Sequence, residues 1–176
     1  MTKNLCILVF ALAFFSCNQR KDAEANTDLL YFDVKGYFKN EALHLQKVKP
    51  LVQKLVNLNG DAESKATKIN DWEKELTIFT DADINKTSWR GSFKINKVAD
   101  TETYTSDNRK IPVKRIIIVK VNGKVTSIEI IRENKNMVYQ STDTLLYYPD
   151  SLYEIRKQQK IKLLNPKKYI ITGKLK

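Results

Sequence analysis

Apolar residues recur every three or four positions between Asp33 and Pro50, which is the spacing of one face of an α-helix. Asp33 has a side chain that commonly caps a helix N-terminus. Pro50 should end the helix, because proline pushes the residue before it out of the helical conformation. The pattern therefore predicts a helix whose apolar face is formed by Val34, Tyr37, Phe38, Ala42, Leu45 and Val48.

The segment from Leu51 to Ile69 has two interpretations. The apolar residues of its first half stand at a helix-like spacing. Asn59-Gly60, however, is a dipeptide preferred in type I′ hairpin turns, and the residues on both sides of it suit strands. We favour a hairpin, with a helix as the alternative.

A second helix is predicted from Asn70 to about Ile84. The sequence Asn70-Asp71-Trp72-Glu73 fits a capping box that begins at Asn70. Trp72, Leu76 and Phe79 then fall on one face of the helix.

The dipeptide Asn122-Gly123 predicts a two-residue turn between two strands. A regular register would set Ile117 opposite Ile128 and Val119 opposite Thr126. It would place four residues on one face: Ile117, Val119, Ile128 and Ile130. Ile116 and Ile118 would fall on the other face, so we expect this hairpin to be central and covered on both sides.

Further turn signals at residues 134–136, 149–150 and 164–167 separate short strands around Val138 and over residues 145–148, 153–163 and 169–175. Strands this close in sequence must pair antiparallel, because parallel neighbours need a crossover of about a dozen residues or more. The predicted fold class is α+β. It is a single domain over residues 29–176, with a curved antiparallel meander sheet and two helices packed on one face.

The chain begins with a different pattern. Leu5 to Phe15 is an uninterrupted apolar run that follows a short start carrying Lys3. The run is too short for a membrane span, which needs roughly 20 residues. A basic start, a short apolar stretch and a small residue at its end are typical of a secretory signal peptide, predicted over residues 1–16.

The next residue, Cys17, gives this segment a resemblance to bacterial lipoproteins. Ser16 and Cys17 match the end of a lipobox, whereas Phe14 and Phe15 stand where the family prefers Leu and a small residue. The resemblance covers residues 1–17 and implies cleavage before Cys17, lipidation of Cys17 and attachment to a membrane through that lipid anchor. An ordinary cleaved signal followed by an incidental cysteine is the alternative.

Residues 17–28 are expected to form a lipidated tether, because no large apolar residue interrupts NQRKDAEANTD. In the resembling family, Asp directly after the cysteine marks retention in the inner membrane of Gram-negative cells. Asn18 occupies that position and favours the outer membrane. The expected location is thus the cell envelope, after export.

Charge adds a candidate binding surface, since 31 basic and 20 acidic residues give a net charge of +11. The excess is concentrated near the C-terminus. Alternation on a final hairpin predicts core-side positions for Tyr153, Ile155, Ile161, Leu163, Tyr169, Ile171 and Leu175. It directs outward the residues Arg156, Lys160, Lys162, Lys168, Lys174 and Lys176. These residues either form a solvated sheet face that also protects an edge strand or contact anionic lipid or an envelope polymer. Export argues against nucleic acid as a partner.

The residues offer little for catalysis or metal binding. His44 is the only histidine, and no cysteine follows Cys17, so neither a zinc site nor a cysteine nucleophile is expected. Residues 81–85 imitate the start of a calcium loop, but Lys86 and Ser92 occupy the places of its glycine and its glutamate. We expect no cofactor, no metal and no catalytic residue. The expected function is a non-enzymatic binding or scaffolding domain, and the alternative is a carrier of a lipid or another apolar ligand.

Overall fold

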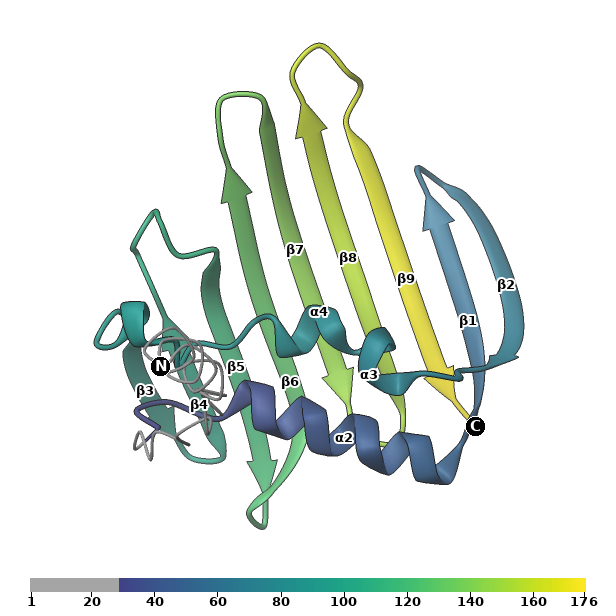
Figure 1. The fold of residues 1–176 in the computed structure, drawn as a ribbon, viewed down its shortest axis with the longest axis horizontal. Helices are drawn as coiled ribbons and strands as arrows, with labels where there is room; N and C mark the ends of the chain where they lie inside the picture. The colour runs from purple at the N-terminus through teal and green to yellow at the C-terminus, as the bar shows by residue number, and fades with distance from the viewer. Residues whose placement is uncertain (1–28) are drawn as a thin grey trace, which may run out of the picture.

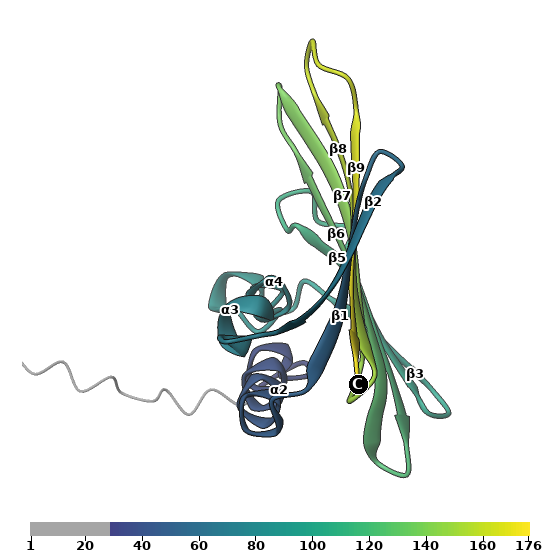
Figure 2. The ribbon, with the colours of Figure 1, turned by 90° about the vertical axis from the view of Figure 1, so that its right-hand side faces the viewer.

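The computed structural model describes residues 29–176, and the predicted signal peptide, Cys17 and the tether lie outside the described residues. Over 29–176 the chain forms one open antiparallel sheet of nine strands, with the helices on one face (Figures 1 and 2). The predicted antiparallel sheet is confirmed. The fold is mostly β, so the helical share is smaller than the α+β prediction implied.

Helix α2, Val34–Val48, forms where the apolar spacing predicted it. Asp33 caps it by accepting a hydrogen bond at 2.8 Å from the backbone N–H three residues later. Lys49 ends it in the left-handed conformation, directly before Pro50. Val48 is 57% exposed, so the buried face ends one turn earlier than predicted. The buried residues of the helix all belong to the predicted face: Val34, Phe38, Ala42 and Leu45.

The next segment is a hairpin of β1 (Leu51–Leu58) and β2 (Asp61–Lys68). Asn59 and Gly60 have φ values of 54° and 110°, the positive values that a type I′ turn requires. The hairpin interpretation is confirmed, and the helical alternative is wrong.

The predicted second helix is wrong in its length and in its cap. The segment forms two single turns, α3 (Trp72–Glu75) and α4 (Thr77–Thr80). Asp71, rather than Asn70, caps α3 by accepting a backbone hydrogen bond at 2.9 Å. The Thr77 hydroxyl donates to a carbonyl of the preceding turn, a bond that competes with the helical ladder. The predicted apolar residues are nevertheless fully buried: Trp72, Leu76, Phe79 and Ile84.

A 3₁₀ turn, η1 (Thr87–Trp89), leads into the remaining strands. They are β3 (Lys94–Val98), β4 (Thr101–Thr105), β5 (Val113–Val121), β6 (Lys124–Lys135), β7 (Tyr139–Tyr148), β8 (Leu152–Ile161) and β9 (Lys167–Leu175). Strands β5 to β9 form the predicted meander, whereas β3 and β4 were not predicted. The two short strands predicted around Val138 and over residues 145–148 are one strand, β7. The sheet does not end with the meander. Its order is β2-β1-β9-β8-β7-β6-β5-β4-β3, so the first hairpin pairs with the last strand. The edges of the sheet are β2 and β3.

The hairpin of β5 and β6 has the predicted turn but a different register. A β-bulge beside Val119 shifts the pairing by one residue, and Ile118 rather than Ile117 lies opposite Ile128. The shift reverses the two faces of β5. The buried residues that face the helices are Ile116, Ile118, Ile128 and Ile130. Since the described helices cover only this face, the expected covering of both faces is wrong for residues 29–176.

Two buried tyrosines of the sheet fasten the helices to it. The Tyr147 hydroxyl on β7 donates to Glu41 of α2 at 2.7 Å, and the Tyr153 hydroxyl on β8 donates to Glu75 of α3. Burial, and then the hydrogen bond to the carboxylate, raises the pKa of both hydroxyls. Both tyrosines therefore stay protonated and keep donating at physiological pH.

A polar cluster joins β3, β4 and β5 near one edge of the sheet. The Glu102 carboxylate accepts hydrogen bonds from Lys120 at 2.9 Å, from Tyr104 at 2.7 Å and from Lys97 at 3.3 Å. The hydrogen bond from Lys120 contributes most to lowering the pKa of Glu102 to about 2. Ionised Glu102 is thus a fixed part of the fold.

The space between the helices and the sheet is filled by one cluster of apolar side chains. Its largest fully buried members are aromatic: Trp72, Tyr147, Tyr153, Phe38 and Phe79. Within residues 29–176, no helix has the length and apolar character needed to cross a bilayer.

Candidate functional site

We call the sheet face that points away from α2, α3 and α4 the open face. Tyr153 of β8 is buried on the helix side, and successive residues of a strand alternate between faces. The cross-strand partners on β9 follow the same alternation. Four of the six basic residues predicted to point outward therefore share the open face: Arg156, Lys160, Lys168 and Lys174.

The other two lie outside the strands. Lys162 is in the turn between β8 and β9, and Lys176 follows the end of β9. β8 was expected to continue to Leu163 with that side chain in the core, but the strand ends at Ile161. Leu163 has a φ of 68° in the turn and is 96% exposed, so its predicted core position is wrong.

The pairing of β9 with β1 also changes the explanation of the basic residues. Protection of an edge strand was one of the two interpretations. Strand β9 lies between β8 and β1, however, and is not an edge. Edge protection therefore does not explain the lysines of β9.

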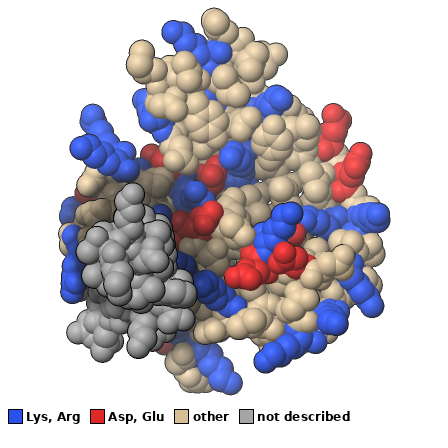
Figure 3. All heavy atoms as spheres, in the orientation of Figure 1, with Lys and Arg blue, Asp and Glu red and all other residues tan. Residues whose placement is uncertain are grey.

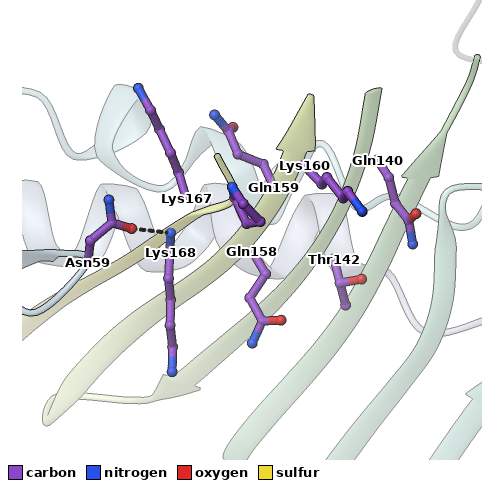
Figure 4. A pocket seen from close by; sticks show the side chains of 9 residues that line it. Asn59, Gln140, Thr142, Gln158, Gln159, Lys160, Lys167 and Lys168 are labelled. Carbon is purple, nitrogen blue, oxygen red and sulfur yellow. Dashed lines mark hydrogen bonds between the residues drawn. The ribbon is translucent and has the colours of Figure 1, made fainter. Parts of the chain in front are cut away.

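Two of the predicted lysines line a groove at the end of β7, β8 and β9, close to the turn between β8 and β9 (Figure 4). Its volume is about 380 Å³. Gln158 lies opposite both Thr142 and Lys168. Lys160 lies opposite Gln140. Figure 4 shows Thr142, Gln158 and Lys168 extending to the same side of the strands. The complete lining is Asn59, Gln140, Thr142, Gln158, Gln159, Lys160, Pro166, Lys167 and Lys168.

The groove is positively charged. No acidic residue is among those that line it. Lys160, Lys167 and Lys168 are exposed, and within residues 29–176 none of them forms an ion pair. The side-chain oxygen of Asn59 accepts a hydrogen bond from the Lys168 backbone N–H at 2.8 Å, which fixes the start of β9. Figure 4 shows Lys167 extending to the other side of the strands from Lys168. An anion on the open face would therefore meet the ammonium groups of Lys160 and Lys168 together with amide and hydroxyl donors.

Arg156, on the same face, differs from these lysines because its charge is compensated. Its Nε donates to Glu154 at 2.5 Å. The other oxygen of Glu154 accepts a hydrogen bond from the Thr172 hydroxyl at 3.0 Å. Arg156 is therefore part of a local polar network, and the uncompensated charge lies in the groove.

The amide and hydroxyl residues of the groove were not among the predicted site residues. Gln158 stands between Arg156 and Lys160 in β8, so the alternation that sorted the lysines would also have found it. Asn59 reaches the groove only because β1 pairs with β9, a long-range contact that no local pattern signals.

The residues considered for catalysis and metal binding form contacts with neighbouring residues. His44 is paired with Asp150 at 2.9 Å, and both side chains are largely exposed. The Asp83 carboxylate accepts the Asn85 backbone N–H, and the Asn85 amide donates to the Phe32 carbonyl. In the described part of the chain, no three side chains of His, Cys, Asp or Glu gather as a metal site.

Comparison with protein-family models, with curated proteins and with solved structures finds no match to this chain.

Proposed function

We propose that this chain is a lipid-anchored lipoprotein of the cell envelope, with the outer membrane as the favoured location. Its folded domain binds anionic groups and does not act as an enzyme. The observation that carries the binding proposal is the groove whose three lysines face no acidic residue. The anchor rests on the signal-like start of the sequence and on Cys17.

The composition of the groove suits an anionic envelope polymer. Each lysine near a charged surface contributes up to about 1 kcal/mol. The four amide side chains supply donors and acceptors that match hydroxyl and carbonyl groups between the charges of such a polymer. A lipid surface has the same negative charge, but it has no extended polymer chain that could lie along the groove.

The carrier of an apolar ligand has less support. Such a carrier needs an apolar cavity, and the space between helices and sheet is filled by aromatic side chains such as Trp72 and Tyr153. Most of the residues that line the groove are polar or charged, and the same holds for a second hollow beside α3 and α4.

The anchor is tested by cell fractionation of the Cys17→Ala variant. We expect this variant to move from the membrane fraction to the soluble envelope fraction, because lipid on Cys17 is the proposed attachment. Cys6→Ala is the matched control and should stay with the membrane. If Cys17→Ala also stays with the membrane, the anchor is wrong.

Binding is tested with a version that begins at residue 18, using polyphosphate as a soluble anionic polymer and phosphatidylglycerol vesicles as a lipid surface. The Lys160→Gln/Lys168→Gln variant should bind polyphosphate up to about thirtyfold more weakly, as two lysines at about 1 kcal/mol each allow. Lys35→Gln/Lys39→Gln removes the same charge from exposed positions of α2 and should have little effect. Equal losses of affinity in the two variants would show that binding depends on the overall positive charge and not on the groove. Stronger binding to the vesicles would favour lipid as the partner.

A further inference from the structure

A second hollow lies on the helix-bearing face, where α3 and α4 cross the strands (Figure 1). Its volume is about 760 Å³, and small-molecule sites range from roughly 300 to 1,000 Å³. Figure 3, which views this face, shows basic and acidic side chains intermingled over its middle. The lining of the hollow combines charged and polar residues with four isoleucines, Ile69, Ile78, Ile155 and Ile171. The hollow is separate from the groove on the open face.

Three charged residues form a row across the floor of this hollow. The strand register sets Arg132 of β6 opposite Asp143 of β7, and Asp143 opposite Lys157 of β8. Asp143 is 3% exposed, and its Oδ1 has no hydrogen-bond partner within residues 29–176. The same holds for Arg132 Nε and for the hydroxyl of Ser141, which is 2% exposed. Buried polar atoms are nearly always satisfied by protein groups or by ordered water, so this group calls for water or a ligand as its partner.

Arg132 and Asp143 do not satisfy each other, although their strands place them side by side. They form no ion pair. Instead, Arg132 Nη1 donates to the carbonyl of Ile78 in α4 at 3.2 Å, which holds the guanidinium toward the helix wall of the hollow. A donor on Arg132 and an acceptor on Asp143 are thus both left without a partner within residues 29–176.

The hollow has a small excess of positive charge, because five basic and four acidic residues line it. The acidic ones are Asp71, Glu75, Asp81 and Asp143, and within residues 29–176 only Glu75 among them forms an ion pair. Lys54 is paired with Glu75 at 2.6 Å. Lys68, Lys74 and Lys157 line the hollow as well, and none of them forms an ion pair within the described chain. A bound group would therefore meet free ammonium groups beside the buried row.

We propose that this hollow binds a hydroxyl-rich, negatively charged sugar, with Arg132 and Asp143 hydrogen bonding to its hydroxyls and Lys157 pairing with its acidic group. A hydroxyl both donates and accepts, so it satisfies Asp143 and Arg132 together. A simple anion without hydroxyls would place a second negative charge beside Asp143. A simple cation would place another positive charge beside Arg132 and Lys157. An apolar ligand would bury all three without partners.

The test is isothermal titration calorimetry of the full-length chain in a mild non-ionic detergent. The probes are D-galacturonate, D-galactose, acetate and trigalacturonate. Galacturonate should bind saturably and at least about tenfold more tightly than galactose or acetate, because only galacturonate has both the hydroxyls and the charge. If trigalacturonate binds more tightly than galacturonate, the source of the sugar is a polysaccharide. If the two bind equally tightly, the ligand is a free sugar acid. Absence of saturable galacturonate binding up to about 10 mM would overturn the proposal.

Variants separate this site from the groove and from a structural role. Lys157→Gln should weaken galacturonate binding at least about fivefold, whereas Lys160→Gln on the open face should not change it. Asp143→Asn should weaken binding without lowering the melting temperature, because the carboxylate has no partner in the fold to lose. Equal effects of the two lysine variants, or a large fall in melting temperature for Asp143→Asn, would show that the row is structural. Binding of polyphosphate to the groove is unaffected by this outcome, so the two proposals fail separately.

Discussion

Gly173 of β9 leaves room for a buried tyrosine, and this makes Gly173→Ala an informative variant. Gly173 lies opposite Tyr153, which is fully buried and donates its hydroxyl hydrogen bond to Glu75. Tyr153 also packs edge-on against Trp72, with 6.4 Å between the ring centroids. The glycine therefore determines whether the ring that fastens α3 can occupy its place.

The magnitude follows from the geometry. A Cβ on Gly173 would lie 2.2 Å from two ring carbons of Tyr153, whereas ordinary contact begins at 3.4 Å, so the ring must move by more than about 1 Å. Trp72 and the bond to Glu75 restrict that movement. Overpacking costs typically about 1–3 kcal/mol, and we expect about 3 kcal/mol of unfolding free energy. For a chain of this size, that corresponds to a melting temperature lower by roughly 6–12 °C.

Urea unfolding followed by circular dichroism measures the change. Lys174→Ala, an exposed neighbour in the same strand, is the control and should stay within about 0.5 kcal/mol of the parent chain. In a Tyr153→Leu background the ring is absent, and Gly173→Ala should then cost less than about 1 kcal/mol. The same cost in both backgrounds would refute the steric explanation.

Three further comparisons test the fold. Ile118→Ala should destabilise the protein by about 2–5 kcal/mol and Ile117→Ala by clearly less, because the bulge turns Ile118 toward the helices; equal losses in urea unfolding would contradict that register. Asp71→Ala should cost about 1 kcal/mol and Asn70→Ala almost nothing, as thermal melts can show, since Asp71 is the cap. The pKa of Glu102 is about 2 in the folded protein and 4.5 ordinarily, so its ionised form stabilises the fold above about pH 4.5, and this is lost as the pH falls toward 2. Glu102→Gln should therefore cost at most about 3 kcal/mol near pH 7, and the difference from the parent chain should shrink by about pH 3; a constant difference would rule this out.

Features that depend on a few neighbouring residues could be predicted from the sequence. Asn59-Gly60 identified the first hairpin because positive φ at two successive positions is a local requirement. The apolar spacing after Asp33 identified α2 for the same kind of reason. The β5–β6 register could not be predicted, because the bulge beside Val119 inserts an offset that the alternation of Ile117 and Ile118 does not reveal.

Only part of the candidate site could be predicted from the sequence, for a related reason. Alternation correctly placed Lys160 and Lys168 on one face. It could not show that β9 is an interior strand, nor that Asn59 lies beside Lys168, since both depend on pairing between distant parts of the chain. The row of Arg132 and Asp143 likewise depends on the packing of α4 over the sheet.

The contact between β1 and β9 has a consequence for how the protein acquires its shape. Val52 pairs with Leu175, so the sheet cannot be completed until the residues of β9 have been synthesised. Contacts so distant in sequence slow folding. A sheet that is completed only by β9 delays the folded state, and this suits the export proposed above, because a secretion pore admits unfolded chain.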